Sequence, residues 1–207
     1  MILPLFVGRD ASIRAIDHAL NTNRMVLLIT QKDLSIESPQ PSDLYSVGTV
    51  CMIMRMLKLP DGRVKILVQG LSKVKVKEYI QQEPFFMVKI EKLKEEKPVE
   101  MTLENEALIR NVKDQIEKAV SLGKNIMPDV MALLESIDDP SRLADLIASN
   151  IGFKTDQAQA ILEMRDPIEK LRKISEILAR EIQLLTIQQK IQTEARGEID
   201  KTQREYF

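Results

Sequence analysis

Hydrophobic and polar residues alternate along most of the first half of the chain, with the two-residue period of β-strands. Strands are predicted at residues 2–7, 49–59, 63–69, 74–79 and 86–93. Residues 25–30 are apolar throughout, which is typical of a strand buried on both faces. Pro60, Asp61 and Gly62 have the sequence of a tight turn, so the strands on either side of them are expected to form a hairpin.

One helix is predicted in this half, at residues 10–21. Ile13, Ile16 and Leu20 recur at helical spacing, and Asp10 or Ser12 can cap the first turn. His18, the only histidine, lies on the other side of this helix and is expected to face solvent. The first half is therefore predicted to be a small, mainly antiparallel β-domain with one or two helices.

Helical spacing replaces the alternation after residue 97. Helices are predicted to start near Thr102, Pro128, Pro140, Thr155 and Pro167. The charged stretch at residues 94–98 separates the two patterns. We therefore predict an α+β fold, with a β-rich subdomain at residues 1–97 and a helical subdomain at residues 98–207.

The last predicted helix is unusually long. Asp166, Pro167 and Glu169 provide a cap, a first-turn proline and a capping-box acid, and no stop signal precedes about Arg204. Such a helix would extend for about 57 Å at about 1.5 Å per residue. Its apolar stripe thins after Leu185, so the first part should pack on a bundle and the rest should project. We expect the chain to be a piece of a longer one.

Composition and charge exclude several kinds of site. The 207 residues include 30 basic and 31 acidic ones, and this near-neutral balance gives no support to a bulk nucleic-acid binder. One Cys and one His exclude an intramolecular disulfide, a cysteine metal cluster and a histidine pair. The sequence has no Walker loop, no nucleophile elbow and no secretory or transmembrane segment. We expect a cytoplasmic chain with no catalytic, cofactor or metal site and no membrane partner.

Methionine is abundant, with ten residues, whereas tryptophan is absent. Met52, Met54 and Met56 alternate along a strand and are predicted to share one face. A core face that methionine fills and an adaptable surface for varied sequences both fit this pattern. Phe85 and Phe86 are predicted to begin a strand with their rings on opposite faces, so that one ring is core and the other can be exposed.

Two further features have ordinary structural explanations. Lys73, Lys75 and Lys77 form a basic strand face, which fits a solvated or edge-protecting face as well as a nucleic-acid patch. No aromatic residue lies between these lysines. Cys51 lies in an apolar strand with no neighbour in sequence that would lower its pKa, so we expect a buried structural thiol.

Several blocks of the sequence are distinctive. They are Leu3-Pro4-Leu5-Phe6-Val7-Gly8-Arg9 with residues 12–16, residues 44–49 and 56–70 around the hairpin, residues 144–149, and Thr202-Gln203-Arg204-Glu205-Tyr206-Phe207. Together these blocks resemble the amino-terminal domain of the Lon protease family. The blocks occur in order over nearly the whole chain. In the family a strand and a turn precede the first block, and we expect them to be missing here. The resemblance therefore does not predict which strand forms the edge of the β-domain.

The resemblance implies a part of an ATP-dependent serine protease of the AAA+ class, a hexamer that degrades misfolded and regulatory proteins in the bacterial cytoplasm. Its ATPase module, with ATP and Mg, and its Ser-Lys protease module have no counterpart in this chain. No catalytic residue can therefore be carried over, and this fragment is not expected to be an enzyme. The amino-terminal region is implied to capture unfolded or damaged protein substrates and to support hexamer assembly.

Exposed apolar residues are the candidates for substrate or partner contact. Ile199 and Tyr206 are seven residues apart and share a helix face, and Phe207 follows directly. The full set is Met52, Met54, Met56, Phe85, Phe86, Ile199, Tyr206 and Phe207. Packing of the last three on an absent module fits equally well.

Two other classes of function remain open. One is a free-standing adaptor or scaffold with a coiled-coil arm, formed by the long helix. The other is a nucleic-acid-binding module, because the 15 basic and 11 acidic residues up to Lys97 give the β-rich half a net charge of +4.

Overall fold

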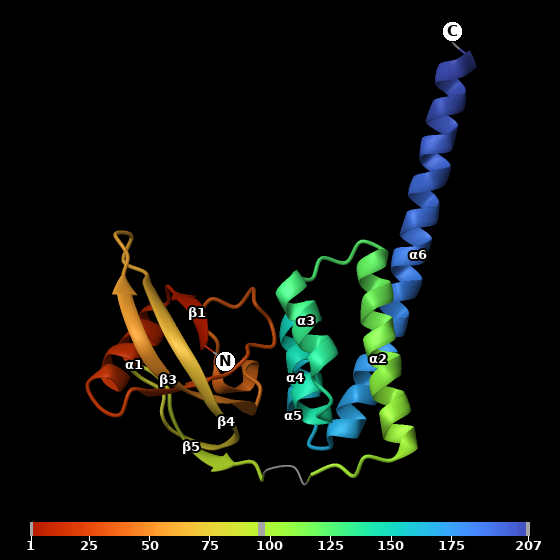
Figure 1. Cartoon of the computed structure of the whole chain (residues 1–207). Helices are drawn as coiled ribbons and strands as arrows, with labels where there is room; N and C mark the ends of the chain where they lie inside the picture. The colour runs from red at the N-terminus through yellow and green to blue at the C-terminus, as the bar shows by residue number, and fades with distance from the viewer. Residues whose placement is uncertain (1, 95–97, 206–207) are drawn as a thin grey trace. The chain divides into compact units, whose positions relative to one another are not determined.

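The computed structural model describes residues 2–94 and 98–205, with their side chains except those at positions 200 and 203–205. The chain divides into two compact units, Met1–Glu95 and Glu96–Phe207, and each has a hydrophobic core of its own. Strands and one α-helix form the first unit, and helices form the second (Figure 1). The predicted α+β class is confirmed.

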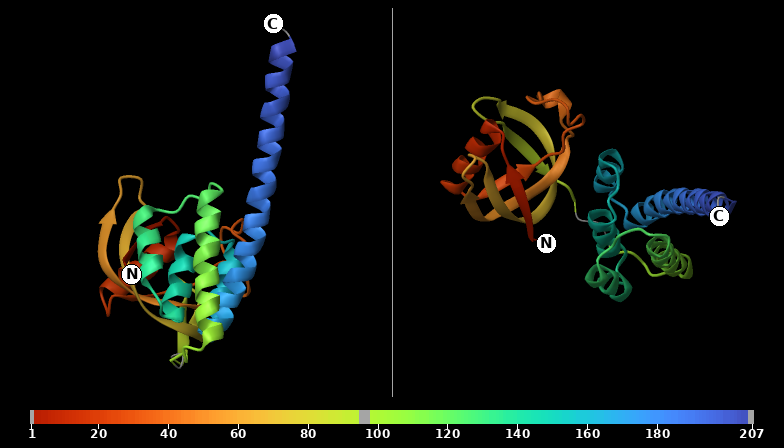
Figure 2. Two further views of the ribbon diagram at one scale, coloured as in Figure 1. Left: turned by 45° about the vertical axis from the view of Figure 1, so that its right-hand side comes forward. Right: turned by 90° about the horizontal axis from the view of Figure 1, so that it is seen from above.

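A curved antiparallel sheet makes up most of the first unit (Figure 2). Its strands are β1 (Ile2–Val7), β2 (Met25–Leu28), β3 (Val47–Lys58), β4 (Val64–Gln81) and β5 (Met87–Lys92). The strand order is β1-β4-β3-β2, and β5 pairs with the later part of β4. The predicted hairpin joins β3 to β4, and Gly62 adopts the positive φ of 86° that this turn requires.

One face of the sheet holds the core of this unit. Ile53, Ile66 and Val68 are buried there, and helix α1 (Asp10–Leu20) packs Ile16 and Ala19 against them. Neither predicted cap is used at the start of α1. Arg9 occupies the N-cap position without a side-chain hydrogen bond, and Asp10 is already helical.

Strand β2 differs from its prediction in length and position. It ends at Leu28, and among the residues that the structure describes it pairs only with β3, at the end of the strand order. None of its four residues is buried, so the prediction of a strand buried on both faces is wrong. An apolar run does not specify where a strand lies within a sheet, because that position is set by distant partners.

The second unit is a bundle of helices. They are α2 (Leu103–Ser121), α3 (Pro128–Ser136), α4 (Pro140–Asn150), α5 (Thr155–Glu163) and α6 (Pro167–Glu205). Thr102 caps α2 by accepting the Asn105 N–H, and Asp139 caps α4 by accepting the Arg142 N–H. Gly123 follows α2 with a φ of 105°, as predicted for a glycine that closes a helix.

Helix α6 is packed on the bundle along its first part only. Leu171, Ile174 and Leu178 are fully buried, and Lys170 is buried with its Nζ 3.9 Å from a carboxylate oxygen of Asp145. From Thr186 to Ile199 every side chain is exposed. The ribbon of α6 continues past the end of α2 within the same unit, as predicted for a projecting helix (Figure 1).

Candidate functional site

Strand β3 contains a β-bulge in the middle of the candidate methionines. Ile53 lies opposite Val68, and Arg55 lies opposite Leu67, so Met54 has no partner of its own in the register. A bulge inserts one residue into one strand and reverses the alternation of faces beyond it. The odd-numbered side chains of β3 therefore face the core before Met54, and the even-numbered ones face it after Met54.

The bulge places Met56 on the opposite face of the sheet from Met52 and Met54. Met52 lies opposite Gln69 on the face away from the core, and Met54 is 44% exposed. Met56 lies opposite the buried Ile66 and packs against the core. The prediction that Met52, Met54 and Met56 share one face is wrong, because the alternation does not continue through the bulge.

The face of the sheet away from the core carries a group of exposed apolar side chains. The register brings Ile2, Gln69, Met52 and Met25 into one row, Pro4, Leu67 and Arg55 into the next, and Phe6, Lys65 and Leu57 into a third. We call its apolar residues Ile2, Phe6, Met25, Met52, Met54, Leu57 and Leu67 the outer sheet face. Phe6 and Leu57 are 64% and 60% exposed. Exposed apolar residues that gather on one face mark an interaction site more often than scattered ones.

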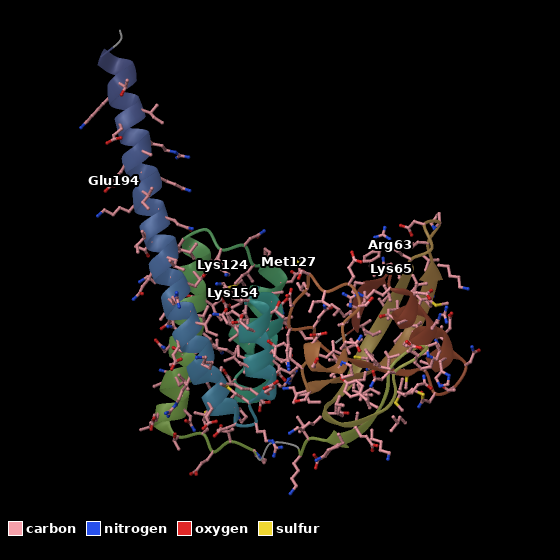
Figure 3. The ribbon with its side chains drawn as sticks, turned by 180° about the vertical axis from the view of Figure 1, so that it is seen from behind. Arg63, Lys65, Lys124, Met127, Lys154 and Glu194 are labelled. Carbon is pink, nitrogen blue, oxygen red and sulfur yellow. The ribbon has the colours of Figure 1, made fainter. Side chains whose placement is uncertain are left out.

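Basic side chains lie at the hairpin end of this face (Figure 3). The Nζ of Lys65 is 5.5 Å from the centre of the Phe6 ring, within the range of a cation–π interaction. Arg63 forms an ion pair with Asp61 in the turn, with 2.6 Å between nitrogen and oxygen. Hydrogen bonds from the Arg63 side chain and backbone hold the pKa of the Asp61 carboxyl below its usual range. The outer sheet face therefore combines an apolar centre with a charged edge.

Phe85 and Phe86 lie in the turn before β5 and do not begin a strand as predicted. The Phe85 ring centre is 5.2 Å from that of His18 on α1, and the Phe86 ring centre is 5.5 Å from that of Tyr79 on β4. The Gln81 side chain donates a hydrogen bond to the Phe85 carbonyl across this turn. Phe85 and Phe86 lie outside the β4–β5 pairing. Both rings are half-buried, and they attach this turn to α1 and β4.

A second exposed apolar group lies on the projecting part of α6. Its members are Leu184, Ile187, Ile191 and Ile199, which are 50–59% exposed. With about 100° between successive residues, Leu184, Ile187 and Ile191 point away from the side of α6 that packs on the bundle. Ile199 is exposed as well, whereas Tyr206 and Phe207 lie outside the described residues. Glu194 marks this part of the helix in Figure 3.

Groups that could support chemistry are sparse in residues 2–94 and 98–205. No three His, Cys, Asp or Glu side chains come together there as a metal site requires. Cys51 is buried, as predicted, and burial raises the pKa of its thiol, which disfavours the reactive thiolate. No described helix is both long and apolar enough to cross a membrane.

The predicted basic strand face contains acidic residues as well. Lys77 lies 2.8 Å from Glu91, and Lys89 on the neighbouring strand lies 3.1 Å from Glu78. These exposed pairs place negative charge among the lysines of β4. A continuous basic patch, which a nucleic-acid backbone would require, is therefore not favoured.

Sequence comparison identifies the family. The family model described as "ATP-dependent protease La (LON) substrate-binding domain" matches residues 1–180. The Lon protease of Geobacter metallireducens is 54% identical to this chain over 207 residues, and the Lon protease of Escherichia coli is 40% identical over 207 residues. This chain belongs to the Lon substrate-binding domain family.

The Lon relatives are much longer than this chain. The match covers 100% of this chain but 25% of the Geobacter protein and 26% of the E. coli protein. Among solved structures, the N-terminal domain of a Mycobacterium avium complex Lon protease superposes with a TM-score of 0.65 at 21% identity, covering 86% of this chain and 90% of that one. A Lon N-terminal domain protein from Xanthomonas campestris gives 0.58 at 14% identity, covering 84% and 88%. The fold is therefore that of Lon N-terminal domains, and the resemblance found in the sequence is confirmed.

Proposed function

We propose that this chain captures unfolded, damaged or regulatory protein substrates for an ATP-dependent protease, and that the outer sheet face holds them. The observation that carries the proposal is the exposure of Phe6, Met54 and Leu57 together on this face. Unfolded proteins present apolar segments that folded proteins bury, so an exposed apolar surface favours them. The family description, which names substrate binding, supports the same function.

The chemistry of this face suits binding that is weak and tolerant of sequence. Complete burial of one large apolar side chain contributes about 1.5–3 kcal/mol, whereas ordering one residue of an extended segment costs about 1–2 kcal/mol. Several contacts must therefore act together to hold a segment. The unbranched side chains of Met25, Met52 and Met54 can adapt to different partners, which favours capture of many sequences followed by release.

Family membership suggests the remaining functions of the whole protein. ATP and Mg would bind an ATPase module, and peptide bonds would be cleaved in a protease module, both outside this fragment. We further propose a β-rich subdomain at residues 1–97 that binds substrate and a helical subdomain at residues 98–207 that supports assembly of a cytoplasmic hexamer. Ile199, Tyr206 and Phe207 on the distal part of α6 would contact substrate or a neighbouring subunit.

Binding of casein, a natively unfolded protein, to the 207-residue chain tests the role of the outer sheet face. Phe6→Ser and Leu57→Ser are each expected to weaken binding about tenfold, because each removes about 1.4 kcal/mol of apolar contact. Leu103→Ser is the matched control, since Leu103 is 85% exposed but belongs to α2. Affinity can be measured by fluorescence anisotropy of labelled casein, with circular dichroism to verify folding.

The same assay separates the two exposed apolar groups. An Ile191→Ser, Ile199→Ser double variant changes α6 alone and is expected to lose less casein affinity than either outer-face variant. If both outer-face variants bind casein as tightly as the original chain does, the proposal is wrong. Loss of casein binding in the α6 variant alone would show that α6, and not the outer sheet face, binds the substrate.

A further inference from the structure

Three methionines gather on the outer sheet face, where leucine or isoleucine would bury equal apolar area. Met25 on β2 lies directly opposite Met52 on β3, and Met54 follows two residues further along β3. Met25 and Met54 are 41% and 44% exposed, and Met52 is half-buried. Met56 packs against the core instead. The sheet thus brings three thioether groups from two strands to one solvent-accessible surface.

A thioether differs from a hydrocarbon side chain in its reactivity with peroxides. The sulfur lone pair attacks one peroxide oxygen, so an S–O bond forms while the O–O bond breaks. The displaced hydroxide takes the proton of the oxygen now bound to sulfur and leaves as water. The sulfur is oxidised by two electrons and the peroxide is reduced by two. The sulfoxide is polar, and thiol-dependent sulfoxide reductases return it to the thioether.

We propose that Met25, Met52 and Met54 form a reversible oxidation site that controls how strongly the outer sheet face holds apolar segments. This inference rests on the proposed function of that face. In the thioether form the three side chains contribute apolar, adaptable contact area. In the sulfoxide form they place polar S=O groups on the same surface, and an apolar segment that covers them must remove their hydration.

The fold itself should survive this oxidation. The exposed sulfur groups lie on the side of the sheet away from Ile53 and Ile66, which form the core with α1. Met56, which packs against the core, is half-buried and less exposed than Met25 and Met54. The switch would therefore change affinity without unfolding the unit.

Two other exposed methionines provide an internal control. Met101 precedes α2, and Met127, which Figure 3 labels, is the N-cap of α3. They are 50% and 67% exposed. Both belong to the helical unit and lie outside the outer sheet face. They should react with peroxide as readily as Met25 and Met54, with no consequence for binding.

The experiment treats the 207-residue chain with dilute hydrogen peroxide, removes the peroxide by desalting, and then measures casein affinity. Peptide mapping by mass spectrometry is expected to show sulfoxide at Met25 and Met54 before Met56. Casein binding should weaken about tenfold with an unchanged circular dichroism spectrum, and a mixture of the two stereospecific methionine sulfoxide reductases should restore it.

Variants separate the oxidation site from other effects of peroxide. The triple variant Met25→Leu, Met52→Leu, Met54→Leu is compared with itself, and its casein affinity is expected to be the same before and after peroxide treatment. Such volume-conserving changes are usually well tolerated, and a single Met54→Leu variant, with partial protection, serves if the triple variant does not fold. The Met101→Leu, Met127→Leu variant should remain as sensitive to peroxide as the original chain.

Two results would overturn the inference while the proposed function stands. One is unchanged casein affinity after all three outer methionines have been oxidised, and the other is a triple variant that still loses affinity. If the untreated original chain does not bind casein, the proposed function and the inference both fail.

Discussion

Gly48 illustrates how closely neighbouring strands approach one another in this sheet. A Cβ atom at position 48 would overlap the carbonyl oxygen of Leu28 and lie 2.6 Å from Cδ1 of Ile29. A backbone oxygen cannot move aside without disturbing the pairing of β2 with β3. At Gly70 the nearest atom to an added Cβ is Cγ2 of Thr49, at an ordinary contact distance of 3.6 Å.

Gly48→Ala is therefore expected to lower the free energy of unfolding of the β-rich unit by about 1–3 kcal/mol, the usual cost of overpacking. Gly70→Ala is the matched control and should change it by about 0.5 kcal/mol or less. Urea denaturation of each variant, followed by circular dichroism, gives both values. Equal stability of the two variants would show that the contact at position 48 is readily relieved.

For some residues the sequence alone could not predict on which face of the sheet the side chain lies. Met52 and Met54 could be predicted as candidates because their residue type and spacing are visible in the chain. The packing of Met56 against the core could not be predicted, because the bulge at Met54 appears only when β3 is paired with β4. Phe6 and Leu57 were missed for the same reason, since only the register brings these residues of different strands to one face.

At the level of elements, the helices could be predicted more closely than the strands. The signals at Thr102, Pro128 and Asp139 act within one turn of the helix that they start, so the local sequence contains them. The position of a strand in a sheet depends on residues far along the chain. This dependence explains why β2 was expected in the interior of the sheet and lies at the end of its strand order.

The cap of α4 offers a quantitative test of such a local signal. Asp139 accepts a hydrogen bond of 2.8 Å from the Arg142 N–H, and Asp139→Ala is expected to cost about 1 kcal/mol of stability. The adjacent Asp138 is 86% exposed and pairs with Lys113, so Asp138→Ala should cost about 0.5 kcal/mol or less. Thermal unfolding measures both changes. Equal losses would mean that the hydrogen bond at the cap adds nothing beyond a surface charge.

For the whole molecule, the important property is that the two hydrophobic cores share no residue. The first core draws on residues 5–68, and the second draws on residues 108–178. Because burial of apolar area is the main favourable contribution to folding, a unit with a complete core of its own has what it needs to fold. The division of the chain should therefore be visible in its unfolding.

We expect fragments 1–94 and 98–207, expressed separately, each to unfold cooperatively. The midpoint of each fragment should lie within a few degrees of the corresponding transition in the intact chain, because neither core loses a member. Differential scanning calorimetry of both fragments and of the intact chain makes the comparison. A fragment without a cooperative transition would show that its unit depends on the other.

The division of α6 into a packed part and an exposed part gives the helix a mechanical property. From Thr186 to Glu205 it extends for about 30 Å at about 1.5 Å per residue. If the helix pivots as a stiff rod near Ile182, about 35 Å from Glu205, a tilt of about 10° displaces its far end by about 6 Å, close to one helical turn. A small change in the packing around Leu178 would thus displace the far end of the helix by a larger distance. A force applied to that end would likewise be transmitted to the bundle. α6 is in this sense a lever whose fulcrum is the core of the helical unit.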